Sequence, residues 1–398
     1  MQNRLFLNKV HFKGFKSIED LQVDFEKGLN ILIGKNASGK SNFLECLNLA
    51  MSTGVSLKHL KSSYKYTKIE FVSSDKNTFI LESEKETPSQ ISLFKDENIE
   101  KEINIKEKLF INNKIGYDSS SNKRLLEYIV YQSKRVYMRN NIRYFFLKVG
   151  YNSINPLYLK FNLPENLDCI SISGTLKIEF NEIFDRWNDL NTLYFLVDLF
   201  WSVESSYKGE INKIKKINKT SFLNHLKIKE EIKENLKKYS PIQDVKFNEN
   251  LNIYKDEKSI TIENLKIDFK INNKWVPWSL LSDGTKRLFY IIAEISNLES
   301  GFVLVEEPEL GIHPHQFSLI MEFLKKESES KQIIISTHSP QALNQLNENE
   351  LSQILITSYD SKKGTQIKHL TVSQKKKAIR YMNEVGFLSD YWLLSDLE

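Results

Sequence analysis

The segment from Gly34 to Ser41 reads Gly-Lys-Asn-Ala-Ser-Gly-Lys-Ser and matches the pattern G-x-x-x-x-G-K-[ST] at every fixed position. An apolar run precedes it, and apolar residues at helical spacing follow it. In this strand–loop–helix context the backbone N–H groups of such a loop surround phosphates. Lys40 is expected to contact the β- and γ-phosphates, and the Ser41 hydroxyl to ligate Mg²⁺. The predicted binding residues are Gly34, Lys35, Asn36, Ala37, Ser38, Gly39, Lys40 and Ser41.

Two glutamates follow a second buried segment. Residues 302–305 are apolar on both faces, as in a central parallel strand, and Pro308 cannot continue the ladder. Glu306 and Glu307 are therefore expected at the carboxyl end of a strand, where open α/β sheets bind ligands. By their order, Glu306 is assigned to Mg²⁺ and Glu307 to general-base activation of water. The alternative is a solvated acidic turn, which the upstream loop disfavours.

A histidine and a helix start complete the pattern. His338 follows an apolar run, Ile333 to Ile335, and is expected to donate a hydrogen bond to the γ-phosphate or to Glu307. With Lys40 and Glu307 it forms the predicted catalytic set. Ser282 precedes an apolar helical spacing and is a predicted N-cap, and a helix start is also an anion site.

The four segments GKNASGKS, LLSDGT, FVLVEEPE and IIISTHSP, in this order, resemble the head of an ABC-type ATPase of the SMC/RecF/OLD-like branch. The stretch from Glu306 to Pro314 resembles the AAA-type ATPases of bacterial defence operons more than transporter heads. The resemblance covers residues 1–60 and 270–398. It implies ATP and Mg²⁺ as cofactors and a homodimer formed through ATP. It also implies that the signature residues Ser282, Asp283 and Gly284 contact ATP on the other subunit, although Asp283 stands where the family usually carries a second glycine.

The resemblance also implies a fold: an α/β P-loop ABC-ATPase head with a mixed central sheet, an antiparallel β subdomain and an inserted helical arm. Residues 6–25 resemble the family's leading strand pair. Alternating runs between Lys68 and Asn113 predict an antiparallel meander, and residues 181–239 predict helices. The expected division is 1–115 and 251–398 for the two parts of the head, and 116–250 for the arm. Gln132 is a candidate for the family's glutamine loop.

Charge is concentrated in the arm. The chain has 398 residues and a net charge of +5, whereas Lys208 to Lys238 contains ten lysines and four glutamates. Such a run is either a solvated helix face or a patch for nucleic acid or an acidic partner.

Two cysteines give neither a disulfide framework nor a zinc pattern. No apolar segment is long enough to span a bilayer, so a cytoplasmic location without a membrane partner is expected.

The predicted function is that of a sensor or regulatory ATPase in an anti-phage defence module with a separate effector, a nuclease or toxin. Sixty residues follow His338, too few for a Toprim nuclease domain beside the last elements of the sheet. The chain is therefore expected to have no nuclease activity of its own. The first alternative is a RecF-like ATPase of DNA repair or chromosome maintenance. The second is the nucleotide-binding subunit of a transporter, which the large middle insert disfavours.

His313 and His315 are read as loop residues rather than a metal pair.

Overall fold

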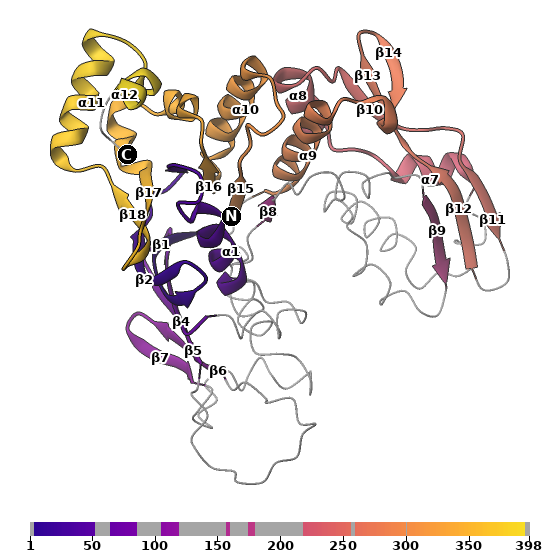
Figure 1. Cartoon of the computed structure of the whole chain (residues 1–398). Coiled ribbons are helices and arrows are strands. Elements are labelled where there is room, and N and C mark those ends of the chain that lie inside the picture. The colour runs from indigo at the N-terminus through magenta and orange to yellow at the C-terminus, as the bar shows by residue number, and fades with distance from the viewer. Residues whose placement is uncertain are drawn as a thin grey trace. The chain divides into compact units, whose positions relative to one another are not determined.

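The computed structural model describes residues 4–51, 64–85, 105–118, 157–159, 174–179, 218–255, 259–299 and 301–394. Contacts divide the chain into two compact units (Figure 1). The first unit comprises Met1–Leu159, Ser300–Pro308 and Leu324–Glu398, and the second comprises Lys160–Glu299 and Glu309–Phe323. Each unit therefore contains segments distant in sequence. The three-part division of the chain stays a prediction, and Gln132 lies outside the described residues.

A single mixed sheet of twelve strands forms the framework of the first unit. In spatial order its strands are β7 (Lys114–Asp118), β6 (Ile105–Ile111), β5 (Thr78–Lys85), β4 (Tyr66–Ser73), β1 (Leu5–Phe15), β2 (Ile18–Asp24), β18 (Gly364–His369), β17 (Ile354–Asp360), β3 (Leu29–Ile33), β16 (Lys331–Thr337), β15 (Gly301–Glu306) and β8 (Leu157–Leu159). The predicted α/β head with a mixed central sheet is thereby confirmed.

Five neighbouring strands run parallel, and they position the loop from Gly34 to Ser41, the two glutamates and His338. β3 pairs with β17 on one side and β16 on the other, and β15 lies between β16 and β8. Every residue of β3, β15 and β16 is buried, which explains their apolar runs. The register places Ile33 beside Thr337, and Ser336 beside Glu306. The carboxyl ends of three strands therefore meet at one edge of the sheet.

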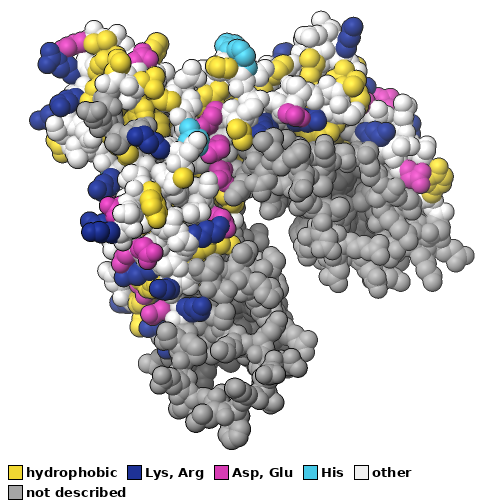
Figure 2. All heavy atoms as spheres, in the orientation of Figure 1, with side chains coloured by type: hydrophobic (Ala, Val, Ile, Leu, Met, Phe, Trp, Pro, Cys, Tyr) yellow, Lys and Arg dark blue, Asp and Glu magenta, His cyan; other side chains and the backbone are white. Residues whose placement is uncertain are grey.

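The antiparallel part of the sheet begins with β1 and β2, the predicted leading pair. β4, β5, β6 and β7 continue it as a meander from the other edge of β1, as the alternating sequence runs predict. β4 alternates strictly between buried and half-buried residues. Figure 2 shows basic and acidic side chains intermingled on the visible face of this unit, and Lys68 pairs with Glu82 at 2.9 Å. This β region is continuous with the main sheet.

Helix α1 (Lys40–Met51) is the centre of the core in the first unit. It contacts β1, β15 and β16, and most of its apolar side chains are buried. Phe43 packs against the rings of Phe12 and Phe25, at centroid separations of 5.8 and 6.1 Å. A helix apolar on nearly all sides must be enclosed by other elements. The loop that precedes α1 is therefore anchored at a helix that cannot shift freely.

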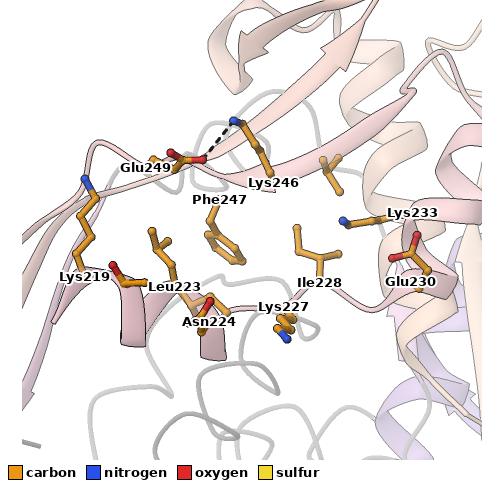
Figure 3. Close-up of a pocket in the computed structure, with 13 residues that line it drawn as sticks. Lys219, Leu223, Asn224, Lys227, Ile228, Glu230, Lys233, Lys246, Phe247 and Glu249 are labelled. Atoms are coloured by element: carbon orange, nitrogen blue, oxygen red, sulfur yellow. Dashed lines mark ion pairs between the residues drawn. The ribbon is translucent and has the colours of Figure 1, made fainter. Parts of the chain in front are cut away.

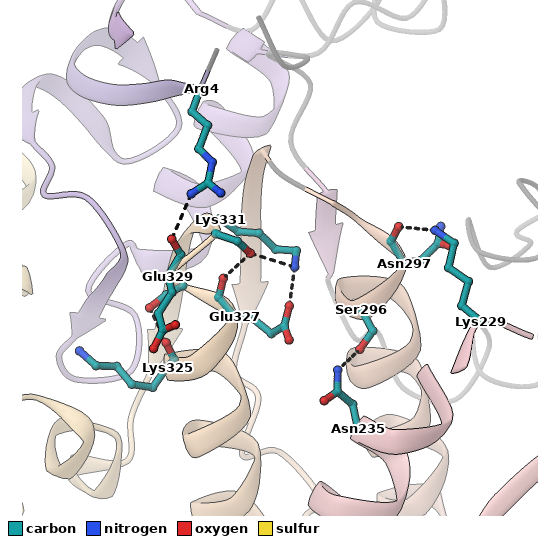
Figure 4. A network of polar contacts seen from close by, with 11 residues as sticks. Arg4, Lys229, Asn235, Ser296, Asn297, Lys325, Glu327, Glu329 and Lys331 are labelled. Atoms are coloured by element: carbon teal, nitrogen blue, oxygen red, sulfur yellow. Dashed lines mark hydrogen bonds and ion pairs between the residues drawn. The ribbon is translucent and has the colours of Figure 1, made fainter. Parts of the chain in front are cut away.

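Polar contacts attach the start of the first strand to the amino-terminal end of β16, and Figure 4 shows one of them, in which Arg4 Nη1 donates to the Glu329 carbonyl oxygen at 3.2 Å. Gln332 accepts from the Leu7 backbone N–H at 2.7 Å and donates to the Leu7 carbonyl at 2.9 Å. Next to it, Lys331 and Glu327 form a short ion pair with both side chains almost fully buried. Removing one member of such a pair costs about 3–5 kcal/mol, because the other charge is left buried. The contacts between Gln332 and Leu7 join residues 325 positions apart in the sequence.

The C-terminal region ends in two helices. The sequence predicts one helix and a tail from residue 373 onward, but the structure has α11 (Val372–Glu384) and α12 (Leu388–Leu394). α11 begins with a capping box between Thr371 and Gln374. α12 packs on the short 3₁₀ segment Pro340–Gln345, and the Ser389 N–H donates to Asn344 Oδ1 at 2.9 Å. The second helix thus depends on a tertiary contact.

The second unit contains helix α9 (Asp283–Asn297) and α8 (Glu230–Tyr239), which pack together, and α7 (Lys219–His225). It also contains most of α10 (Pro314–Glu327). One three-stranded sheet has the strand order β10 (Asp244–Phe247), β13 (Ile267–Ile271) and β14 (Lys274–Pro277). Another has the strand order β11 (Asn252–Lys255), β12 (Ser259–Leu265) and β9 (Gly174–Glu179). Helices α7 and α8 lie in the region predicted to be helical, and residues 180–217 lie outside the description.

Side-chain contacts hold α9 in this unit. Asn235 of α8 donates to Ser296 Oγ at 2.9 Å (Figure 4). Phe289 meets the rings of Phe269 and Trp278 edge-on at 4.8 and 5.8 Å, a geometry that aromatic pairs favour. Trp278 therefore packs as the sequence suggests. Among all described helices, none combines the length and apolarity required to cross a membrane.

Candidate nucleotide site at the carboxyl ends of three parallel strands

The loop from Gly34 to Ser41 connects β3 to α1 and is shaped by two close backbone approaches. A Cβ on Gly34 would lie 2.1 Å from the Thr357 carbonyl oxygen on β17. A Cβ on Gly39 would lie 1.9 Å from Thr365 Oγ1 on β18, and Gly39 has a φ of +99°. Neither position admits a side chain: Gly34 is required by its contact alone, and Gly39 by its contact and by its left-handed backbone conformation. The loop is fixed against two neighbouring strands.

Lys40, the first residue of α1, turns back into this loop. Its Nζ donates to the carbonyl oxygens of Gly34 at 2.7 Å and Lys35 at 2.9 Å, and the side chain is buried. The same Nζ lies 3.1 Å from Nδ1 of His338, which follows β16. The ammonium is therefore positioned where the loop would enclose phosphate groups. This contact also joins the loop to the histidine predicted to act with it.

His338 bridges Lys40 and Glu307. Its Nε2 lies 2.6 Å from Glu307 Oε1, and its Nδ1 faces the Lys40 ammonium. Nε2 carries the hydrogen given to the Glu307 carboxylate, whereas Nδ1 lies beside both a donor, the Lys40 ammonium, and an acceptor, the Gly34 carbonyl oxygen at 3.2 Å. Of the two contacts that the sequence left open for His338, the structure shows the one with Glu307, and the one with the γ-phosphate stays a prediction.

Glu307 adopts an unusual backbone conformation with φ of +47°. Its N–H donates to the Ser336 carbonyl at 2.8 Å, which extends the pairing of β15 and β16 by one residue. A non-glycine residue in the left-handed region is strained and is commonly found at functional positions. The bend directs the Glu307 side chain toward His338, while Glu306 remains the last residue of β15. The two adjacent carboxylates thus occupy different environments.

Glu306 is buried and bonds to a residue that the sequence gave no reason to select. Tyr158, on the short edge strand β8, donates its hydroxyl to Glu306 Oε2 at 2.8 Å. Burial, followed by the charge of Glu306, raises the pKa of the Tyr158 phenol far above its usual range, so it stays a donor. Tyr158 lies beside Leu304 in the register of β8 and β15. A three-residue strand leaves too short a pattern to be recognised in sequence.

Two buried hydroxyls lie in the same group of segments. Ser38 Oγ, in the loop, and Ser336 Oγ, beside Glu306 in the sheet register, form no hydrogen bond with any described atom. Buried hydroxyls normally have a partner. Phosphate oxygens or metal-bound water at the loop would provide one. The Ser41 hydroxyl and the Glu306 carboxylate are oxygen donors of the kind that Mg²⁺ prefers. The residues present therefore fit a phosphate ligand with Mg²⁺.

The predicted signature lies in the second unit, at the start of α9. Ser282 is the N-cap, as predicted, and its Oγ accepts from the Thr285 N–H at 3.3 Å. Asp283 is largely exposed and lies 3.4 Å from Lys286 Nζ. A Cβ on Gly284 would come within 2.8 Å of the Gly311 carbonyl oxygen. The glycine is thus explained by packing within its own unit, and the contact of all three residues with ATP stays a prediction.

Comparison with known proteins decides the family. Residues 29–344 match the family model described as "AAA domain, putative AbiEii toxin, Type IV TA system". The chain belongs to this AAA family. It is 23% identical over 340 residues to an ATP/GTP phosphatase of Helicobacter pylori, which covers 84% of this chain and 85% of that protein. A shorter match, 49% identical over 43 residues, joins it to the DNA replication and repair protein RecF of Oenococcus oeni, covering 11% of this chain and 12% of that protein.

Solved structures show the same fold. An SMC head bound to the C-winged helix domain of ScpA superposes with a TM-score of 0.54 at 14% identity, covering 94% of this chain and 99% of that one. An SMC head with an extended coiled coil, from Pyrococcus furiosus, gives a TM-score of 0.52 at 15% identity, covering 96% of this chain and 100% of that one. This member of the AAA family is therefore an ABC-type ATPase of the SMC/RecF-like kind, as the motifs predict.

The structure brings three of the four predicted segments of this AAA-family ATPase together. The loop, the two glutamates and His338 meet at one edge of the sheet in the first unit. The signature forms its own helix start in the second unit. His313 is exposed in the loop before α10, but His315, expected in the same loop, is exposed in the first turn of α10, and its N–H donates to His313 Nδ1 at 3.3 Å. The roles assigned to the individual site residues stay predictions.

Proposed function

We propose that this ATPase is the sensor and regulatory component of an anti-phage defence module, and that it controls a separately encoded effector, a nuclease or toxin. The family description, which names a toxin of a toxin–antitoxin system, supports this assignment. The observation that carries the enzymatic part is the hydrogen-bonded series Lys40, His338 and Glu307 at the mouth of the loop. It couples a phosphate-contacting cation to a carboxylate suited to activate water.

In this proposal each residue has a defined task. Bound ATP with Mg²⁺ supplies the phosphoryl group that is transferred to water. Lys40 offsets the phosphate charge, and Ser41 and Glu306 hold the metal. Glu307 accepts the proton of the attacking water through Oε2, because His338 holds Oε1. His338 thereby fixes the orientation of the Glu307 carboxylate, the proposed base.

The active assembly we propose is a homodimer in which each signature completes the site of the other subunit. Ser282, Asp283 and Gly284 at the start of α9 present backbone N–H groups and a helix N-terminus to an anion. The position of these residues in a unit separate from the loop is compatible with a role in trans. Closure on ATP and opening after hydrolysis would transmit the nucleotide state to the effector.

A second candidate function is a RecF-like role in DNA repair or chromosome maintenance, favoured by the local matches to RecF proteins. The two functions differ in what controls turnover. A RecF-like ATPase is expected to be stimulated by duplex DNA alone. A defence regulator is expected to require a phage trigger or the effector.

The test uses cells that carry this gene with its native neighbouring genes, challenged with a panel of phages. Protection should be lost with Lys40→Ala and retained with His315→Ala, an exposed histidine outside the site. The purified chain should not cleave DNA or tRNA without its partner. Unchanged plaque counts across the panel, together with turnover stimulated by duplex DNA, would replace the defence role with the RecF-like one.

A further inference from the structure

The two helices that end the described chain, α11 and α12, are only partly enclosed by the rest of the first unit (Figure 1). Helix α11 packs on α12 and on the 3₁₀ segment Glu348–Gln353, and Ala378 is the one buried residue among its thirteen. Most residues of α1 and α9 are buried by comparison. A helix of this length takes most of its stability from tertiary packing. The outer side of α11 therefore has room for a further contact.

Exposed apolar side chains gather in the same two-helix region. Eleven large apolar side chains are exposed in the described part of the chain, and five of them lie here: Val372, Val385, Phe387, Leu393 and Leu394. Single exposed apolar residues are ordinary on a protein surface, but a concentration of them marks an interaction site.

The connection between the helices presents two of these side chains on a fixed turn. Val385 is 68% exposed and Phe387 is 67% exposed. The Tyr381 carbonyl oxygen accepts from the N–H groups of Val385 and Gly386 at 2.8 and 3.1 Å, and the Phe387 carbonyl oxygen accepts from the Asp390 N–H at 3.1 Å. Because these bonds set the backbone of the connection, little conformational freedom is lost when a partner covers the two side chains.

A surplus of positive charge borders the apolar side chains. Three consecutive lysines, 375–377, lie on α11, and within the described part of the chain they form no ion pair. Arg380 pairs with Glu384 at 2.9 Å, so Asp390 is the only other acidic residue of the two helices. Figure 2 shows dark blue and yellow side chains intermingled over this region, at the upper left of the view.

We propose that α11, α12 and their connection form a docking surface for a segment of a partner protein in which apolar side chains lie among Asp and Glu. The apolar side chains of the partner cover Val385 and Phe387, and its carboxylates face the three lysines. An apolar centre with complementary charge at its edge is the usual composition of a protein interface. The inference goes beyond the proposed function, since it does not depend on what the partner does.

Other occupants match this surface less well. In a two-fold contact with a second copy, the same patch meets itself, and lysines would face lysines. A lipid surface binds a helix that presents a continuous apolar face, whereas Lys376, Lys377 and Arg380 occupy the exposed side of α11. A nucleic-acid backbone would engage the lysines but leave Val385 and Phe387 uncovered.

The experiment places the photoreactive residue benzoylphenylalanine at position 387 of the full chain, in cells that carry the native neighbouring genes. After irradiation, the joined protein and its joined segment are identified by mass spectrometry. The matched control carries the same group in place of Tyr254, which is 54% exposed in the second unit. A second probe at position 385 serves if the first protein fails to fold, as judged by thermal denaturation and basal ATP turnover.

Charge is tested in the protein that carries the probe at position 387. The double variant Lys376→Glu, Lys377→Glu reverses two exposed lysines of α11. The control Lys219→Glu, Lys227→Glu reverses two exposed lysines of the second unit, beside the cavity shown in Figure 3. Basal ATP turnover should be the same in both variants, since neither pair of lysines belongs to the nucleotide site.

One protein should be joined at position 387 and not at position 254, through a segment that carries Asp or Glu beside large apolar residues. The α11 reversal should reduce the yield about tenfold or more, and the second-unit reversal should retain it. The proposal is overturned by joining to a second copy, to nucleic acid or to lipid, by no product from either probe, or by equal yields in the two reversals. A joined partner in cells without phage protection would keep the docking surface and count against the defence role, so the two failures are distinguishable.

Discussion

Tyr158 holds Glu306 through a hydrogen bond of 2.8 Å between two neighbouring parallel strands. Glu306 is the carboxylate assigned to Mg²⁺, and its Oε2 is engaged by the phenol. Residues that hydrogen-bond a metal-binding carboxylate fix its orientation. Tyr158 is thus a positioning residue. It acts on Glu306 from the last strand of the sheet.

Tyr158→Phe should raise the Mg²⁺ concentration needed for half-maximal turnover about tenfold, because Glu306 loses the donor that orients it. Turnover at saturating Mg²⁺ should change less. Calorimetric titration of Mg²⁺ into the ADP complex gives a second readout that does not depend on activity. Tyr66→Phe is the matched control: burial and two nearby glutamates raise the pKa of Tyr66 to about 12, but it lies on β4. Identical Mg²⁺ dependence in the two variants would contradict the positioning role.

Glu307→Gln should bind ATP with near-parental affinity and hydrolyse it about 10²–10³-fold more slowly, because only the base is lost. Lys40→Ala should instead lose nucleotide binding. Binding is measured with a fluorescent ATP analogue and turnover by phosphate release. Glu322→Gln, at a carboxylate that pairs with Lys238, is the control for the removal of one carboxylate. Parental turnover in Glu307→Gln would assign the base to another residue.

Ser282→Arg should bind ATP normally yet be inactive, since a bulky cation would stand where the signature must approach the nucleotide of the other subunit. The loss of the N-cap also destabilises α9 by about 1 kcal/mol, so folding is checked by thermal denaturation. Mixing this variant with Lys40→Ala should restore up to one working site per heterodimer. If verified heterodimers showed no recovery at any mixing ratio, the signature would not act in trans.

Glu350 makes a pH-dependent contribution to stability. Burial opposes its ionisation, but bonds from Lys325 and the Asn347 N–H outweigh burial and hold the pKa of Glu350 below its ordinary value. A depressed carboxyl pKa stabilises the fold above the unfolded value of about 4.3, and this stability is lost as pH falls through the folded pKa.

Glu350→Gln should therefore lower the free energy of unfolding at pH 7 by about 1 kcal/mol or less, as expected for a half-exposed pair. The difference from the parent should shrink once the pH falls below the unfolded value of about 4.3 and vanish below the lowered folded pKa of Glu350. Urea denaturation at several pH values measures this. Glu348→Gln, at an exposed glutamate of the same 3₁₀ segment, should show a smaller pH-dependent loss. A deficit in Glu350→Gln that persists unchanged at low pH would refute the assignment to charge.

The meeting of the loop, the two glutamates and His338 at one sheet edge could be predicted, because local patterns specify the strands that carry them. The loop pattern and the apolar runs before Glu306 and His338 each mark the carboxyl end of a strand. Parallel pairing then brings these ends together. The meander was also predictable from alternation, and the leading strand pair from the resemblance to ABC-type ATPase heads.

Other features depend on tertiary contacts that leave no local signal. The position of Tyr158 near Glu306 depends on the pairing of the three-residue strand β8 with β15. Helix α12 has only seven residues, and Ser389 secures it through Asn344. The bend at Glu307 arises because its N–H bonds to Ser336 on another strand. Sequence patterns specify individual helices and strands, whereas these three features arise from contacts between helices and strands.

The fit of Gly34 and Gly39 against Thr357 and Thr365 has a consequence for biosynthesis. On the ribosome the loop emerges more than 300 residues before the strands that shape it, and β3 has no sheet neighbour other than β16 and β17. A nascent chain that ends before Thr365 therefore contains the loop sequence but lacks Thr365, one of the two residues against which the loop glycines pack. Nucleotide is expected to engage only after β17 and β18 have both been synthesised, so products that end before Thr365 should not compete with longer chains for ATP or for a partner that recognises the loaded state.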